Sequence, residues 1–203
     1  GAGGQVTAGG PGTATFTTTQ RSVATPSGVL TAIGASPSIT VLAADGSGTE
    51  TVSPTNVAAS STTTTLTFTY TAATGGMSGG TVEITVPAGW TAPITTAGAG
   101  FTTASGGTGT NVVSTAGQVI TVSGVTLVGG GPLTVVYGSG GGANAVTVPA
   151  ATGNVTFTTT QRSATTPSGV LTAIAVSPVV TVNAANGSGT ETVSPTEVIT
   201  ATG

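Results

Sequence analysis

The feature that most constrains this chain is a long internal repeat. Residues 13–57 return almost unchanged as residues 154–198, at a constant offset of 141 and without a gap. A period of 141 residues is too long for the 20–50-residue unit of a solenoid and close to the size of one ordinary domain. The repeat therefore predicts domains in tandem, of which the 203 residues hold about one and a half copies.

Within the repeat, apolar and polar residues alternate with a period of two. Leu66, Phe68 and Tyr70 alternate with threonine, and the stretch 81–86 places valine and isoleucine at every second position. This alternation is typical of half-buried antiparallel strands, and no segment has the 3.6-residue period of a helix. We expect an all-β fold, an antiparallel β-sandwich, with strands at 65–71, 81–86, 118–122, 133–137, 145–148, 155–159, 170–174 and 179–182.

The alternation also predicts which side chains form the core of one sandwich. These are the aromatic and branched residues on the inward face of each expected strand, together with the single tryptophan: Leu66, Phe68, Tyr70, Val82, Ile84, Trp90, Ile120, Val122, Leu133, Val135, Tyr137 and Phe157.

Two Asx-Gly-Ser-Gly segments, at 45–48 and 186–189, are the most linker-like parts of the chain. We place the domain boundaries there. The expected units are 1–45, the C-terminal part of a preceding repeat; 46–49, a linker; 50–185, one complete sandwich; 186–189, a second linker; and 190–203, the first strand of the next repeat.

The charge of the chain excludes several classes of function. The sequence contains two cations, Arg21 and Arg162, five acids and no histidine, and its net charge is −3. Without a basic patch, the protein has no surface that would bind the phosphates of nucleic acid or the headgroups of an anionic membrane. Residues 84–161 carry no charge, but Thr, Ser and Gly interrupt every apolar run, so we expect no membrane insertion.

Low charge also bears on where the protein works. Only 3% of the residues are charged, although 37% are hydrophobic and the strand pattern argues against disorder. A bare surface with so few charges is poorly soluble, which favours an extracellular or cell-surface protein that is glycan-coated or assembled. No basic-then-apolar leader begins the sequence, so we expect a mature piece or an internal fragment.

Catalysis is not expected. The chain has no His, Cys or Lys, so the usual nucleophile–base pairs cannot be assembled, and no cofactor is implied. Asp45 and Glu50 flank a Gly-Ser-Gly stretch and are weak calcium candidates, but Asn186 replaces Asp45 in the second copy. The alternative interpretation of this stretch is a flexible turn in which Asx-Gly adopts left-handed backbone angles.

Two further sets of residues are candidate sites. Asn154 and Asn186 begin Asn-x-Ser/Thr sequences and are candidate glycosylation sites, while the many threonines are either acceptors for O-linked sugars or simply good strand residues. The two arginines occupy equivalent positions in the repeat, so we expect structural ion pairs of Arg21 and Arg162 with Glu50 or Glu191.

Two stretches resemble a known group. The segment 81–90, Thr-Val-Glu-Ile-Thr-Val-Pro-Ala-Gly-Trp, and the strand pair 169–174 and 179–182 are similar to the immunoglobulin-like tandem repeats of large bacterial surface and adhesin proteins. The resemblance implies an immunoglobulin-like sandwich in an extracellular stalk or filament. The Cys…Trp…Cys signature of antibody domains is absent, and without Lys the Lys–Asn isopeptide bonds of some related pilins cannot form.

These observations favour a non-enzymatic structural component of an extracellular filament, stalk or sheath, whose partners are neighbouring repeats of the same protein. Two alternatives stay open. The chain is either part of a filament or the stalk of an adhesin whose ligand-binding tip lies elsewhere. The repeats are joined either in one long polypeptide or between subunits that donate strands.

Overall fold

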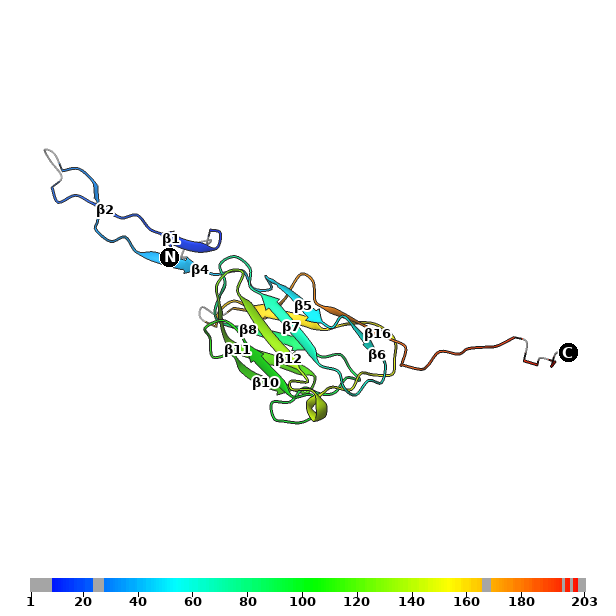
Figure 1. Ribbon diagram of the computed structural model, residues 1–203. Coiled ribbons are helices and arrows are strands. Elements are labelled where there is room, and N and C mark those ends of the chain that lie inside the picture. Colours follow the sequence, from blue (N-terminus) through cyan, green and yellow to red (C-terminus); the bar gives the residue numbers. More distant parts are fainter. Residues whose placement is uncertain (1–8, 24–27, 166–168, 195, 198, 201–203) are drawn as a thin grey trace.

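The computed structural model describes residues 9–23, 28–165, 169–194, 196–197 and 199–200. In this part of the chain the fold is all-β, with one short 3₁₀ helix (Figure 1). The elements are β1 Gly12–Thr15, β2 Thr19–Gln20, β3 Thr31–Ala32, β4 Ser38–Val41, β5 Thr49–Ser53, β6 Asn56–Ala58, β7 Leu66–Thr71, β8 Met77–Thr85, β9 Thr102–Ser105, β10 Val112–Ala116, β11 Val119–Leu127, β12 Pro132–Tyr137, η1 Gly142–Asn144, β13 Gly153–Thr156, β14 Thr158–Arg162, β15 Thr172–Ala173 and β16 Val179–Asn183.

Strands β5 to β16 form a sandwich-like unit of packed sheets. One sheet has the order β10-β11-β8-β14-β15, and the sheet facing it has the order β5-β7-β12-β9. A third, smaller sheet, β13-β16-β6, closes one side. All strand pairs are antiparallel except β16 with β6, which are parallel. An all-β fold with antiparallel sheets is therefore confirmed.

The core lies where the inward faces of the two larger sheets meet. In β7, Leu66, Phe68 and Tyr70 are buried while the threonines between them are half-buried, which is the alternation seen in the sequence. The Phe157 ring packs at its centre, 5.1 Å from the Phe68 ring and 5.2 Å from the Trp90 ring between centroids. All twelve residues expected in the core are at most 4% exposed, so that prediction is confirmed.

Some strand boundaries differ from the expectation. Residues 145–148 form no strand. Val146 makes an isolated bridge with Thr64, and the Val148 N–H donates to Ser61 O at 2.8 Å. Strands β9 and β10 were not expected, because their threonine, serine and alanine residues lack a strong apolar alternation. Strand β8 begins at Met77, four residues before the expected Thr81, and includes the glycine pair Gly79-Gly80.

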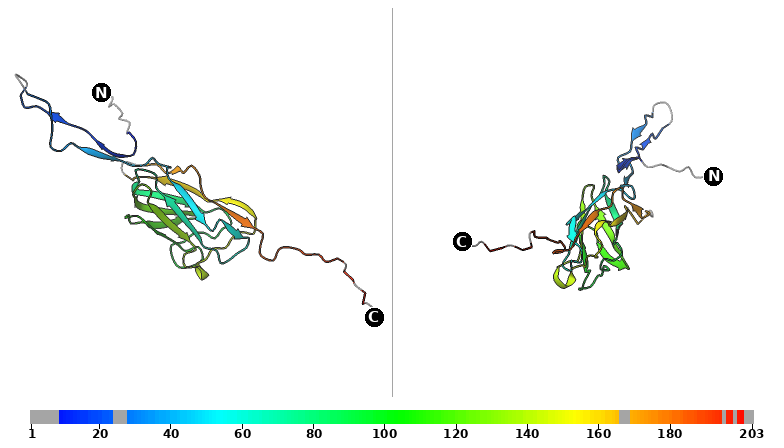
Figure 2. Two further views of the ribbon diagram at one scale, coloured as in Figure 1. Left: turned by 45° about the horizontal axis from the view of Figure 1, so that its top comes forward. Right: turned by 90° about the vertical axis from the view of Figure 1, so that its right-hand side faces the viewer.

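The two ends of the chain lie outside this unit. Strands β1 to β4 form a long hairpin that projects from one end of the sandwich, while the described residues after Asn183 leave the opposite end without forming a strand (Figures 1 and 2). Parts of the expected units 1–45 and 190–203 lie outside the described residues. No helix in the described part of the chain is long and apolar enough to cross a bilayer.

The projecting hairpin and one hairpin of the sandwich are copies of each other. We call residues 12–41 the N-terminal hairpin and residues 153–182 the sandwich hairpin. The pairs of β1 with β4 and of β13 with β16 have the same register at the offset of 141, and so do β2 with β3 and β14 with β15. Because this pairing forms in both places, we conclude that the repeated sequence specifies it locally.

Candidate functional site

The most specific polar contacts lie where the N-terminal hairpin joins the sandwich. Residues 46–48 were expected to be linker and residues 43–45 the end of a preceding repeat, yet hydrogen bonds hold the whole segment 43–48 to the sandwich. The backbone N–H of Ala43 donates to Gly76 O, and that of Gly46 donates to Gln161 O at 3.1 Å. The Tyr70 hydroxyl donates to Ser47 O at 2.8 Å. Residues 43–48 therefore join the hairpin to the sandwich as a docked segment.

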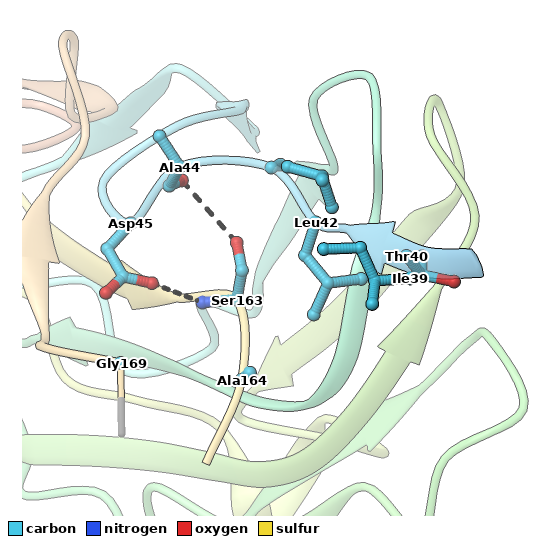
Figure 3. Close-up of a pocket in the computed structure, with 10 residues that line it drawn as sticks. Ile39, Thr40, Leu42, Ala44, Asp45, Ser163, Ala164 and Gly169 are labelled. Carbon is cyan, nitrogen blue, oxygen red and sulfur yellow. Dashed lines mark hydrogen bonds between the residues drawn. The ribbon is translucent and has the colours of Figure 1, made fainter. Parts of the chain in front are cut away.

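Asp45 is the centre of this docked segment. One carboxylate oxygen accepts a hydrogen bond from the backbone N–H of Ser163 at 2.7 Å, and the other accepts one from the N–H of Val170 at 2.6 Å. The Ser163 hydroxyl donates to Ala44 O at 3.5 Å, and Figure 3 shows both hydrogen bonds of Ser163. The Asp45 side chain thus connects the two ends of the loop between β14 and β15.

Glycine permits the tight path of the docked segment. Gly46 has φ +74°, the left-handed conformation expected of an Asx-Gly turn, and a Cβ at this position would lie 2.7 Å from Ala173 O. The equivalent turn at 184–188 keeps the same local hydrogen bond, from Ser188 N–H to Ala185 O, but all its residues except the half-buried Ala185 are solvent-exposed. The conformation of the turn is therefore set by its local sequence, whereas its contacts with a sandwich require a sandwich that follows it in the chain.

A cleft of about 400 Å³ lies beside Asp45, between the base of the N-terminal hairpin and the β14–β15 loop (Figure 3). Ile39, Val41 and Ala164 contribute apolar walls. Among the described residues that line the cleft, the one charged group is Asp45, and both of its oxygens already accept backbone hydrogen bonds. The cleft offers a ligand little polar recognition.

We expect Asp45→Asn to lower the free energy of unfolding by about 1–2 kcal/mol. The carboxylate of Asp45 offers one acceptor oxygen to each of the two N–H groups, of Ser163 and Val170, whereas an amide has one acceptor oxygen in total. The hydrogen bond that remains also loses the contribution of the negative charge. Urea unfolding followed by circular dichroism measures the change. The matched control is Asn186→Asp at the exposed equivalent position, which should change stability by less than about 0.5 kcal/mol. Equal midpoints for wild type and Asp45→Asn would contradict this role.

Glu50 is a second carboxylate with an unusual environment. It lies on β5 with Val52 facing the interior, and it is 7% exposed. The Thr159 hydroxyl on β14 donates to Glu50 Oε2. Two other side-chain oxygens, Oε1 of Glu50 and Oε1 of Gln161 on β14, are buried without a hydrogen-bond partner among the described residues. Burial raises the pKa of Glu50 to about 7, although the Thr159 hydrogen bond lowers it in part.

Among the described residues of the sandwich, Arg162 and Glu50 have other partners than each other. Arg162 Nε donates to Thr81 Oγ1 at 3.1 Å, and Thr81 is its direct partner across β14 and β8. Alternation on β14 puts Thr159 on the inner face and Arg162 on the outer face, away from Glu50. The acid on the outer face of β8 is Glu83, which accepts a hydrogen bond from Thr121. Arg21 and Glu191 are both solvent-exposed.

The two calcium candidates have separate partners. Asp45 holds the β14–β15 loop, whereas Glu50 points into the sandwich toward Thr159. The described residues contain no group of three or more His, Cys, Asp or Glu side chains that could hold a metal ion. A calcium ion requires six to eight oxygen ligands, which this arrangement of Asp45 and Glu50 does not supply.

Both candidate glycosylation sites are at the surface. Asn154 lies on β13, where its Oδ1 accepts a hydrogen bond from Thr181 at 2.9 Å, and Asn186 lies in the turn after β16. Neither side chain is buried, as attachment of a glycan requires.

Thr159, Gln161 and Thr81 are contact residues that the sequence analysis did not single out. A signal was present for the first two. Phe157, Thr159 and Gln161 are spaced by two, so a buried Phe157 places the other two side chains on the same inward face. Thr81 could be identified as the partner of Arg162 only once the pairing of β14 with β8 was known.

Comparison with known proteins does not assign this arrangement to a family. No protein-family model matches the chain, and no curated protein matches it.

Proposed function

We propose that this protein is a structural, non-enzymatic component of an extracellular surface filament, stalk or sheath, built from immunoglobulin-like sandwiches in tandem. The observation that carries the proposal is the pair of hairpins with one register. Residues 12–41 and 153–182 belong to the 141-residue echo in the sequence and form hairpins of the same register. A unit that recurs at domain spacing is the ordinary construction of proteins that span distance or build surfaces.

The surface of the sandwich supports the same proposal. Titratable groups are few, and Asp45, Glu50 and Glu83 each accept hydrogen bonds from distant parts of the chain. Half-buried and exposed threonines line the outer faces of the strands. A surface so poor in charge needs either glycans or neighbouring subunits to stay in solution. Both conditions are those of an assembled surface layer.

The proposal is tested on native cells. Antibodies against the sandwich should label the outside of intact cells in immunogold electron microscopy, on fibres or a layer with a regular axial spacing. A strand of ten residues spans about 33 Å, so repeats joined by short segments should recur every 35–50 Å or so. Labelling confined to the cytoplasm would contradict the proposal.

The covalent organisation has its own test. Boiling native material in detergent separates donated-strand subunits into a band near the mass of one or two repeats, whereas one long polypeptide stays a very large band. We expect the large band, because residues 13–57 and 154–198 supply the same segment twice within one chain. A tip domain of different composition at one end of the gene would identify the adhesin alternative.

Glycans should be visible in the mass of the native protein. We expect native material to be heavier than the 18.9 kDa that 203 residues supply, because so few charges are available to keep the surface in solution. Mass spectrometry before and after deglycosylation measures the difference. A native mass equal to that of the bare sequence would mean that the threonine faces are covered by other subunits.

A further inference from the structure

The N-terminal hairpin exposes side chains that its copy buries. Phe16 is 53% exposed and its equivalent Phe157 is fully buried. Ile39 is 52% exposed and its equivalent Val180 is fully buried. The same change from exposed to buried holds for Thr18, Gln20 and Ile33 and their equivalents Thr159, Gln161 and Ile174. The inward face of the hairpin is therefore folded but uncovered.

Not every apolar residue of the hairpin follows this rule. Val29 is 76% exposed, and its equivalent Val170 is 69% exposed in the sandwich. The exposed apolar residues thus divide into a set that a sandwich covers and a residue that it leaves in solvent. The division indicates that the hairpin packs against a partner in one specific orientation, because a partner that bound any exposed apolar side chain would also cover Val29.

The strand edges of the N-terminal hairpin are uncovered in the same pattern. In the sandwich, β14 pairs with β8 and β16 pairs in parallel with β6. The equivalent edges, residues 17–21 and 40–42, have no strand partner on that side in the described part of the chain. Open edges beside an apolar face are a template for another strand.

We propose that the N-terminal hairpin docks on the body of a neighbouring copy of this repeat. We define the body as residues 49–148, from β5 through β12 and the segment after it. Strand β2 and its flanks would pair with the β8 of that body, and β4 would pair with its β6. Phe16 would enter the aromatic pocket of Phe68 and Trp90, and Thr18 would donate to Glu50. The inference rests on the tandem arrangement of the proposed function and identifies the partner surface of each repeat.

The body must belong to a second copy because the body in this chain is already occupied. Its β8 edge pairs with β14 and its β6 edge pairs with β16. The Phe157 ring already fills the space between Phe68 and Trp90. Since each body holds one hairpin, successive copies would be linked through residues 43–48, which the Asp45 hydrogen bonds hold against the following sandwich.

Thiol labelling of a two-repeat chain tests the inference. Residues 1–152 are fused to the N-terminus of residues 12–203. This junction continues the repeat in register and keeps the body of residues 49–148 complete, and it creates a leading hairpin without a body before it and an internal hairpin with one. The sequence has no cysteine, so Ile39→Cys in either hairpin introduces a single thiol. We expect the internal thiol to react about 100-fold more slowly than the leading one, because its labelling requires local opening.

Matched controls make the result specific. Val29→Cys should react at similar rates in both hairpins, as its equivalent stays exposed in the sandwich. Phe16→Cys is a second buried position, so that a folding defect from one substitution does not decide the outcome. Val180→Cys in the original chain sets the rate for a docked hairpin.

Protection of the internal Ile39→Cys and Phe16→Cys with reactive Val29→Cys supports docking in the proposed register. Equal labelling of leading and internal thiols overturns the inference and leaves the hairpin for a different partner. Slow labelling at all three positions indicates non-specific association and also overturns it. The extracellular location proposed above is tested on cells, so either proposal can fail without the other.

Discussion

Replacing Phe157 with alanine is expected to lower the free energy of unfolding by about 3–5 kcal/mol, the range for removing a large aromatic side chain from a core. Phe157 is fully buried and packs against the rings of Phe68 and Trp90. Its removal leaves a cavity between two sheets that are held by many other contacts, so the surroundings can relax only in part.

The repeat supplies an unusually close control for this substitution. Phe16 lies in the same Thr-Phe-Thr-Thr-Thr-Gln-Arg sequence and in a hairpin of the same register, but its side chain is half in solvent. Phe16→Ala in the same 203-residue chain should change stability by less than about 0.5 kcal/mol. Urea unfolding followed by circular dichroism and by Trp90 fluorescence measures both variants. Similar losses for the two would mean that Phe16 is already covered.

The second large effect is a fall in stability between pH 4.5 and about pH 7, with Glu50 as its cause. The pKa of Glu50 is about 7 in the folded protein and near 4.5 in an exposed carboxyl, because burial disfavours the charged form. The folded state therefore binds this proton more tightly than the unfolded state. Stability from this group is complete below pH 4.5, decreases as pH rises, and is lost above pH 7.

The difference of about 2.5 pKa units corresponds to about 3 kcal/mol. Urea midpoints measured at intervals from pH 4 to pH 8 should show this decrease. Glu50→Gln should flatten the profile and be more stable than wild type at pH 8, because the amide keeps the shape of the side chain without its charge. Glu83→Gln, a change on the half-buried outer face, should keep the wild-type profile. A pH dependence that persists in Glu50→Gln would assign it to other groups.

The same carboxyl also bears on the neighbouring tyrosine. Burial raises the pKa of Tyr70, and the charge of Glu50 raises it further. The Tyr70 hydroxyl therefore remains a proton donor to Ser47 O over the whole range in which Glu50 titrates. The hydrogen bond that attaches the docked segment to β7 is thus unaffected by the loss of the Glu50 proton.

Much of the fold could be predicted because its signals are local. The alternation of Leu66, Phe68 and Tyr70 with threonine states both the strand and its inward face, and the hairpins follow from short-range pairing. Strands such as β9 and β10 were missed because they lie at the sheet edges, where Thr, Ser and Ala suffice and no apolar face is required.

The candidate site was predicted less well because its contacts join distant parts of the chain. The sequence suggested Asp45 only as a weak calcium ligand or as part of a flexible turn, because its partners Ser163 and Val170 are 118 and 125 residues away. Glu50 lies on a strand whose alternation with Val52 indicates an inward face, yet nothing in the sequence names Thr159 as its donor. For Arg162, the alternation of β14 decided against the expected partner.

The two hairpins separate these contributions. By itself the sequence determined that residues 12–41 and 153–182 form the same ladders, because the pairing of nearby strands depends on local residues and turns. Only the tertiary structure decided that Phe157 is buried and Phe16 is not, since burial requires a surface that another part of the chain supplies. The tertiary structure also sets the pKa of Glu50, because the sheet packed over this side chain removes it from water.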